Sequence, residues 1–287
     1  MVTNCSNNNR IPTSKKVIIF DWDDTICPSS FVDQWKFDSF NDLPLHYQNL
    51  LLEVGKSAIK CLTAASHHGT VIIITNSDDG WVKFSAEKFL PNLLPCLDTI
   101  RIISARTRYE RFYPHQPLCW KAAAFAHEVN EIYATIDSYT TSSSSTTRRP
   151  PEYRREEEVV TVTDDSSTDS SFSTVPPKPL QKQLSSSHYK EVISFGDSME
   201  ERTAVKIVAS QLSASPKSVM FLNNPSPVQL IGQLEMVTDN MAFVCEARKR
   251  LDLEISGGEA LKSAACYLRR RGLVEFLEGS GMGYYVR

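Results

Sequence analysis

Short runs of β-branched and other aliphatic residues recur along the chain, and stretches with helical spacing of apolar residues separate them. Such runs predict strands that are buried on both faces, and helical connections between them predict a mainly parallel sheet. The predicted strands are residues 15–20, 71–75, 99–104, 192–195 and 218–222. The predicted helices include one or two in residues 31–65, and residues 120–129, 242–251 and 259–270.

This alternation predicts an α/β fold, a Rossmann-like three-layer sandwich with helices on both faces of a five-stranded, mainly parallel sheet. We expect a single domain over residues 15–287, with a helical C-terminal extension from about residue 227. Residues 1–14 are rich in Asn and Ser and predict a disordered tail. Between about 138 and 188, Ser, Thr, Pro and clustered charges dominate. We expect this insert to be disordered, because it has too few apolar residues to offset its ordering entropy.

Composition narrows the class of protein. The 287 residues carry a formal net charge of −3, so no strongly basic surface is expected and a nucleic-acid partner is excluded. No apolar run approaches the roughly 18 residues of a membrane span, and the N-terminus lacks the apolar core of a secretory signal. The seven cysteines are scattered without a CxxC pair, which favours reduced thiols. We expect a cytoplasmic protein without a membrane partner; a nuclear location and the oligomeric state are left open.

Acidic side chains follow the first predicted strand. Asp21, Asp23 and Asp24 lie within four residues, where parallel sheets bind their ligands. Acids this close repel one another, so a cation is expected to compensate them, and carboxylates with room for water are typical of a Mg²⁺ site. A single acid at such a place is more often a solvated turn or a helix cap.

Other polar residues are predicted at the same edge of the sheet. Thr75 and Asn76 follow the second predicted strand, and Asp197 follows the fourth in a Gly-Asp turn. Lys121 lies near the start of a predicted helix. Taken alone, residues 76–78 predict a helix N-cap, and Lys121 is typical of a solvated surface.

In this order the residues resemble the motifs of the haloacid dehalogenase-like (HAD) superfamily. Asp21–Thr25 matches the first motif, DxDx[TV], and Thr75 matches the second, a Ser or Thr after an apolar strand. Lys121 matches the third most plausibly, and Gly196–Glu201 matches the fourth, GDxxxD, with Glu in place of the last Asp. The resemblance covers residues 15–225 without the insert.

The resemblance implies phosphoryl transfer. Asp21 would be the nucleophile that forms an aspartyl-phosphate, and Asp23 the general acid and base. Thr75 and Asn76 would bind the phosphoryl group, and Lys121 would supply positive charge to it and to the nucleophile.

The resemblance also implies Mg²⁺ as the cofactor. Its ligands would be the carboxylates of Asp21 and Asp197 and the main-chain carbonyl of Asp23. The departure from the fourth motif leaves the outer acidic position open between Glu201 and its neighbour Glu200.

Neither interval that carries a cap domain in this superfamily, here residues 25–71 and 77–121, has room for a large one. An open site fits a phosphorylated protein better than a small metabolite. The expected function is therefore a Mg²⁺-dependent phosphoric monoester hydrolase. The insert is expected to be neutral filler, with a regulatory tether as the alternative.

Several alternatives stay open. The first is a catalytically silent Mg²⁺-binding scaffold on the same fold. The second is a phosphotransferase, which would need a cap to shield the intermediate. A receiver-type signalling domain is disfavoured, because no Asp ends the third predicted strand. Lys83 and Lys88 remain alternatives to Lys121.

Two further groups have plainer interpretations. Trp81, Phe84 and Phe89 have helical spacing and are predicted in the core. Arg106 and Arg108 follow the third predicted strand and are predicted on the surface, although they could contact a substrate.

Overall fold

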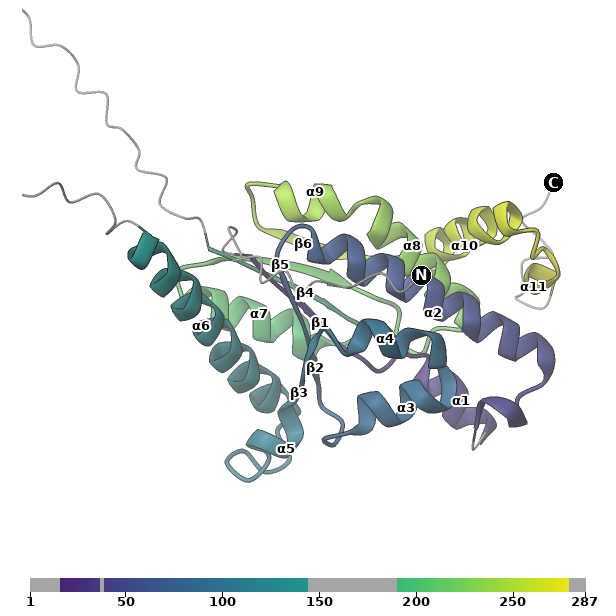
Figure 1. Ribbon diagram of the computed structural model, residues 1–287, viewed down its shortest axis with the longest axis horizontal. Helices are drawn as coiled ribbons and strands as arrows, with labels where there is room; N and C mark the ends of the chain where they lie inside the picture. Colours follow the sequence, from purple (N-terminus) through teal and green to yellow (C-terminus); the bar gives the residue numbers. More distant parts are fainter. Residues whose placement is uncertain (1–15, 37–38, 144–189, 279–287) are drawn as a thin grey trace, which may run out of the picture.

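The computed structural model describes residues 16–36, 39–143 and 190–278. Its centre is a parallel six-stranded sheet with the strand order β3-β2-β1-β4-β5-β6 (Figure 1). The strands are β1 Lys16–Phe20, β2 Thr70–Thr75, β3 Arg101–Ser104, β4 Glu191–Gly196, β5 Ser215–Met220 and β6 Leu251–Glu254. The predicted α/β sandwich with a parallel sheet is thus confirmed, with six strands instead of five.

Helices and short 3₁₀ helices (η) connect the strands. Before β3 they are α1 Ser29–Trp35, η1 Phe40–Asp42, α2 Leu45–Ser66, α3 Trp81–Phe89, η2 Pro91–Leu93 and α4 Leu94–Leu97. Between β3 and β5 they are α5 Ala105–Tyr109, α6 Pro117–Ser143 and α7 Met199–Gln211. After β5 they are α8 Pro227–Asp239, α9 Met241–Glu246, α10 Gly257–Arg271 and α11 Glu275–Glu278. None of the helices in these ranges combines the length and apolarity that a membrane span requires.

Successive side chains of a strand point to opposite faces of the sheet, and helices cover both faces. Ile18 and Phe20 belong to the apolar core beneath α2 and α8, whereas Val17 and Ile19 belong to a second core beneath α6 and α7. Figure 1 shows α6 and α7 on one side of the sheet and α2 and α8 on the other. This arrangement explains why the strands appear in the sequence as unbroken apolar runs.

The segment after residue 227 is largely helical as expected, and α10 covers the predicted helix 259–270, but the segment also contains a strand. Residues 242–251 were expected to form one helix, but α9 ends at Glu246 and β6 begins at Leu251. The missed strand, Leu-Asp-Leu-Glu, is a short edge strand, and only its first residue is buried. An edge strand needs no continuous apolar run, so its pattern is weak. The segment therefore completes the sheet and is not an appendage to it.

The fifth strand begins three residues earlier than predicted. Its start was not predicted because Pro216 and Lys217 are not typical of a buried strand. Lys217 is fully buried, and its Nζ lies 2.8 Å from Oε1 of Glu191 on β4 and donates to the carbonyl of Cys245. A buried ion pair thus replaces the apolar contact that a sequence pattern would reveal.

The expected tail and insert lie mostly outside the described residues, so both stay predictions. The one visible difference concerns the start of the insert. Helix α6 continues to Ser143, five residues beyond the expected boundary at about 138.

Helices α8 and α10 approach so closely that only glycine fits at Gly232. A Cβ added there would lie 1.8 Å from the carbonyl oxygen of Ala260. We predict that Gly232→Ala lowers the free energy of unfolding by about 1–3 kcal/mol, because the helices must separate to admit the methyl group. Urea titration should show a lower midpoint with an unchanged slope.

Gly258→Ala is the matched control, because nothing lies within 4 Å of the corresponding position on α10. This variant should be neutral or more stable, since alanine costs less conformational entropy in a helix. Equal losses in both variants would contradict a packing origin.

Candidate functional site

The strand order brings three separate loops to one edge of the sheet. β1 lies between β2 and β4, so the residues that follow these strands converge at their carboxyl ends. Asp21 follows β1, Thr75 ends β2 and Asp197 follows β4. The N–H of Asp21 donates to the carbonyl of Phe195 at 2.9 Å, so pairing with β4 continues up to the first acid. This edge is where ligands of parallel sheets bind.

A tight turn follows Asp21. The carbonyl of Trp22 accepts hydrogen bonds from the N–H groups of residues 25, 26 and 27, and Asp24 has a left-handed φ of 53°. The indole of Trp22 is fully buried and donates to Ser85 Oγ at 2.9 Å. Asp24 accepts from both the N–H and the hydroxyl of Ser30. The acid of Asp24 and the indole of Trp22 therefore fix the turn.

Lys121 joins the loops together. Its side chain is 1% exposed, and its Nζ lies 2.6 Å from Asp21 Oδ1 and 2.6 Å from Glu201 Oε1. The third contact is a hydrogen bond of 2.8 Å to the carbonyl of Ile74. The three contacts match the three donors of an ammonium group. Neither alternative lysine takes this position, since Lys83 pairs with Asp98 and Lys88 lies over the ring of Phe84.

Glu201 owes its position to the first turn of α7. Ser198 is the N-cap of this helix, and Glu201 accepts hydrogen bonds from its N–H and hydroxyl, which is a capping box. The turned-back side chain lies against Gly196, where an added Cβ would be 2.6 Å from Glu201 Cγ. Of the two acids that the motif left open, Glu201 is the one that lies against Lys121.

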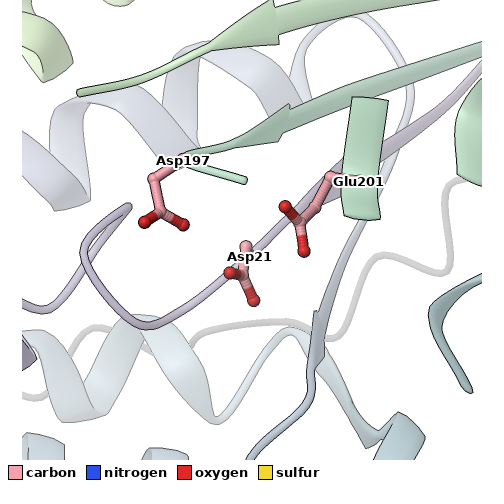
Figure 2. Close-up of side chains that lie close together, drawn as sticks. All are labelled: Asp21, Asp197 and Glu201. Atoms are coloured by element: carbon pink, nitrogen blue, oxygen red, sulfur yellow. The ribbon is translucent and has the colours of Figure 1, made fainter. Parts of the chain in front are cut away.

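Asp21, Asp197 and Glu201 form an acidic group that can hold a cation (Figure 2). One carboxylate oxygen from each lies within 4.8 Å of the other two. Lys121 balances one of the three charges, so a divalent cation would balance the remaining two. Carboxylate oxygens are ligands that hard divalent cations prefer.

Burial and mutual repulsion disturb the titration of these acids. Burial raises the pKa of Asp21 well above its usual value, and the charges of Glu201 and Asp197 add to the rise against the attraction of Lys121. Burial, followed by the charges of Glu201 and Asp24, raises the pKa of Asp197 to about 7. A bound cation would favour the carboxylate forms of both.

The ion pair between Lys121 and Glu201 favours the charged form of both its members. Burial disfavours the charged form of Lys121, but the charges of Asp21 and Glu201 outweigh it and raise the pKa of this lysine. Burial alone would raise the pKa of Glu201, yet the attraction of Lys121 and the hydrogen bond from Ser198 lower it. Both members therefore stay charged at neutral pH.

The acidic group differs in part from the expected metal ligands. Asp21 and Asp197 are both members, whereas the side chain of Asp23 is not. The expected ligand of Asp23 is its main-chain carbonyl, and that stays a prediction. Both oxygens of Glu201 are already engaged, one by Lys121 and one by Ser198. Glu201 therefore suits the outer position that the motif gave it better than direct coordination.

Asp23 lies in a cage of hydrogen-bond donors. Its Oδ2 accepts from Ser77 Oγ at 2.7 Å and from Thr75 Oγ1 at 3.2 Å. Its Oδ1 accepts from the indole nitrogen of Trp81 at 2.8 Å. Asn76 lies apart from this cage, since its side-chain nitrogen donates at 3.4 Å to the carbonyl of Pro117.

Sequence reasoning missed two of these donors. Ser77 was assigned to a helix cap with Asn76, but α3 begins at Trp81 with the left-handed Gly80 as its N-cap. Trp81 was assigned to the core, although a half-buried indole N–H needs an acceptor and that need was an available signal. Phe84 was assigned to the core as well and is 49% exposed, whereas Phe89 is buried.

Arg106 and Arg108 lie on the surface as predicted. Both side chains are 43% exposed. Arg106 pairs with Glu110, and Arg108 pairs with the buried Glu128.

In comparisons with known proteins, no family model, no curated protein and no solved structure matches the chain. The resemblance to the HAD superfamily therefore rests on the residues of this chain and on their arrangement. The assignment of a reaction depends on the same geometry.

We predict that Asp197→Asn stabilises the metal-free protein, because it removes a half-buried charge that repels its neighbours. A folded-state pKa of about 7, above the unfolded value of 3.8, means that wild type loses stability as the pH rises between them. The advantage of the variant should therefore grow from about pH 4 to about pH 7 and reach roughly 1–3 kcal/mol. Urea unfolding in a chelator at several pH values measures it.

The same two proteins are also compared after Mg²⁺ is added. The ion should raise the melting temperature of wild type and leave that of Asp197→Asn nearly unchanged. The exposed Asp79→Asn is the control and should behave as wild type in both tests. An advantage of Asp197→Asn that does not depend on pH would contradict the electrostatic explanation.

Proposed function

We propose that the protein is a Mg²⁺-dependent phosphoric monoester hydrolase of the HAD type that acts through an aspartyl-phosphate on Asp21. The observation that carries this proposal is the contact of Lys121 with Asp21. The lysine engages Oδ1 alone, and Oδ2 accepts no hydrogen bond from the described residues. One oxygen of the carboxylate is thus oriented by a cation while the other is free to attack.

Asp21 and Asp23 divide the chemistry between them. Oδ2 of Asp21 forms a bond to phosphorus as the ester P–O bond breaks, and Asp23 gives its proton to the departing oxygen. A water molecule then attacks the phosphorus, Asp23 takes its proton, and inorganic phosphate leaves with Asp21 restored. Mg²⁺, held by Asp21 and Asp197, would neutralise charge on the phosphoryl oxygens.

The donors around Asp23 differ in what they can do when this acid gives or takes a proton. The indole of Trp81 can only donate. The hydroxyls of Ser77 and Thr75 can also rotate to accept, so they can follow either form of the acid. Rotation of Thr75 would also free it to serve the phosphoryl group, as the second motif implies.

The described connections supply no separate cap domain. Apart from residues 37–38, the chain between β1 and β2 forms α1, η1 and α2, and the chain between β2 and β3 forms α3, η2 and α4. Both sets of helices pack on the sheet or on each other. An open edge of this kind favours a phosphorylated protein as the substrate and hydrolysis over transfer to a second acceptor.

The first test is hydrolysis of an aryl phosphate with and without Mg²⁺. Wild type should release phosphate only with the metal, and Asp21→Asn should lose roughly 10³-fold or more of this activity because it lacks the attacking oxygen. The folded state of the variant is checked by its melting temperature. Asp79→Asn should retain full activity.

The proposal would be wrong if folded wild-type protein bound Mg²⁺ but hydrolysed neither phosphopeptides nor small phosphoesters. The scaffold alternative would then stand, since the same acidic group would hold the ion without turnover. Equal activity of Asp21→Asn and wild type would reject the nucleophile.

The role of Asp23 predicts a dependence on the leaving group. Asp23→Asn should lose roughly 10²–10⁴-fold with an alkyl phosphate, whose departing oxygen needs a proton. The loss should be smaller with a nitrophenyl phosphate, whose departing oxygen is stable as an anion. Turnover of both substrates is compared in the same buffer, and equal losses would contradict proton donation by Asp23.

A further inference from the structure

A pocket of about 730 Å³ lies between α1 and α3. Its apolar wall is formed by Val32, Trp81, Phe84 and Phe89. Its polar lining consists of Ser29, Ser30, Asp33, Lys36 and Lys88. This volume is in the range of sites that bind a drug-sized ligand and far exceeds a phosphate group.

Two residues join the pocket to the acidic turn. Trp81 lines the pocket and at the same time donates to Asp23 at 2.8 Å. Ser30 lines it and donates from its main chain to Asp24 at 3.0 Å. The side chain of Trp81 therefore contacts both the pocket and the proposed general acid.

This position identifies the part of a substrate that would occupy the pocket. In an in-line displacement the leaving oxygen lies opposite the nucleophile, here Asp21, and beside the group that protonates it, here Asp23. The remainder of the leaving group must continue from that oxygen. The pocket beyond Trp81 thus lies on the leaving-group side of the site.

The lining selects the chemistry of the occupant. Phe84 is 49% exposed and lines the pocket, so its ring offers an apolar surface to an occupant. Lys88 lies over its ring, with Nζ 4.8 Å from the centroid. Neither Lys88 nor Lys36 has a carboxylate partner among the described residues. Asp33 is the acid in the lining, so the pocket carries a net positive charge.

We propose that this pocket binds the residues next to the phosphorylated residue of a protein substrate, taking a large apolar side chain against Phe84 and an acidic side chain beside Lys36 and Lys88. The proposal rests on the proposed phosphatase function. A flexible polypeptide is favoured because the apolar wall and the two lysines need both an apolar and an anionic group on one leaving group. Adjacent residues of an extended peptide supply these groups.

The test compares phosphoserine peptides that differ beside the phosphoserine. One carries only Gly and Ser, and the others carry Phe-Glu-Glu before or after the phosphoserine. One of the Phe-Glu-Glu peptides should have a kcat/KM about tenfold higher in wild type, which corresponds to about 1.4 kcal/mol. Phe84→Ala and Lys88→Glu should each remove this preference and keep wild-type activity on the Gly-Ser peptide.

Lys83→Glu is the matched control. Lys83 lies on the same helix but outside the pocket, where it pairs with Asp98. This variant should keep the full preference. Loss of the preference in the control would overturn the assignment to the pocket, as would its survival in Phe84→Ala and Lys88→Glu.

Binding separates failure of the pocket from failure of the proposed function. Fluorescence anisotropy of labelled peptides on Asp21→Asn reports recognition without turnover. Tighter binding of a Phe-Glu-Glu peptide that disappears on Phe84→Ala supports the pocket even if no phosphate is released. Equal binding of all peptides overturns the proposal. Tighter binding of a small aryl phosphate that carries a carboxylate, compared with every peptide, overturns it as well.

Discussion

The buried ammonium of Lys121 is the interaction on which the site depends. It lies between Asp21 on the loop after β1 and Glu201 on α7, and it also donates to the carbonyl of Ile74 near the end of β2. Taking an ion out of water costs several kcal/mol, so each of these charges is tolerable only while its partner is in place. Segments about a hundred residues apart in the sequence are thereby held in one arrangement, and the free oxygen of Asp21 keeps its direction.

The sequence was informative where side chains alternate between two buried layers. Strands β1, β2 and β4 are buried on both faces and have apolar patterns that leave little choice. The edge strand β6 has no such pattern, because solvent takes the place of a neighbouring layer. The start of β5 was hidden for another reason, since Lys217 is buried there by pairing with a residue on the adjacent strand. Long-range pairing of this kind leaves no local signal.

The same distinction applies to the site. Asp21 and Asp197 were predicted from their places after strands, whereas Lys121 was predicted only through the resemblance to the HAD motifs. The structure brings all three together. The roles of Ser77 and Trp81 were not predicted, because they depend on how the chain turns between β2 and α3. Gly80 ends that turn, and its left-handed φ of 83° precedes the first residue of the helix. The backbone conformation, and not the type of side chain, directs the indole toward Asp23.

The indole of Trp81 is shared between Asp23 and the pocket, and this sharing limits how the protein can evolve. A substitution at Trp81 would alter the wall of the pocket and, at the same time, remove a hydrogen bond from the proposed general acid. Phe84 and Lys88 carry no such double role. Divergence of specificity among descendants of this chain would therefore proceed through those outer positions of α3, one and two turns further along, while the tryptophan stays fixed.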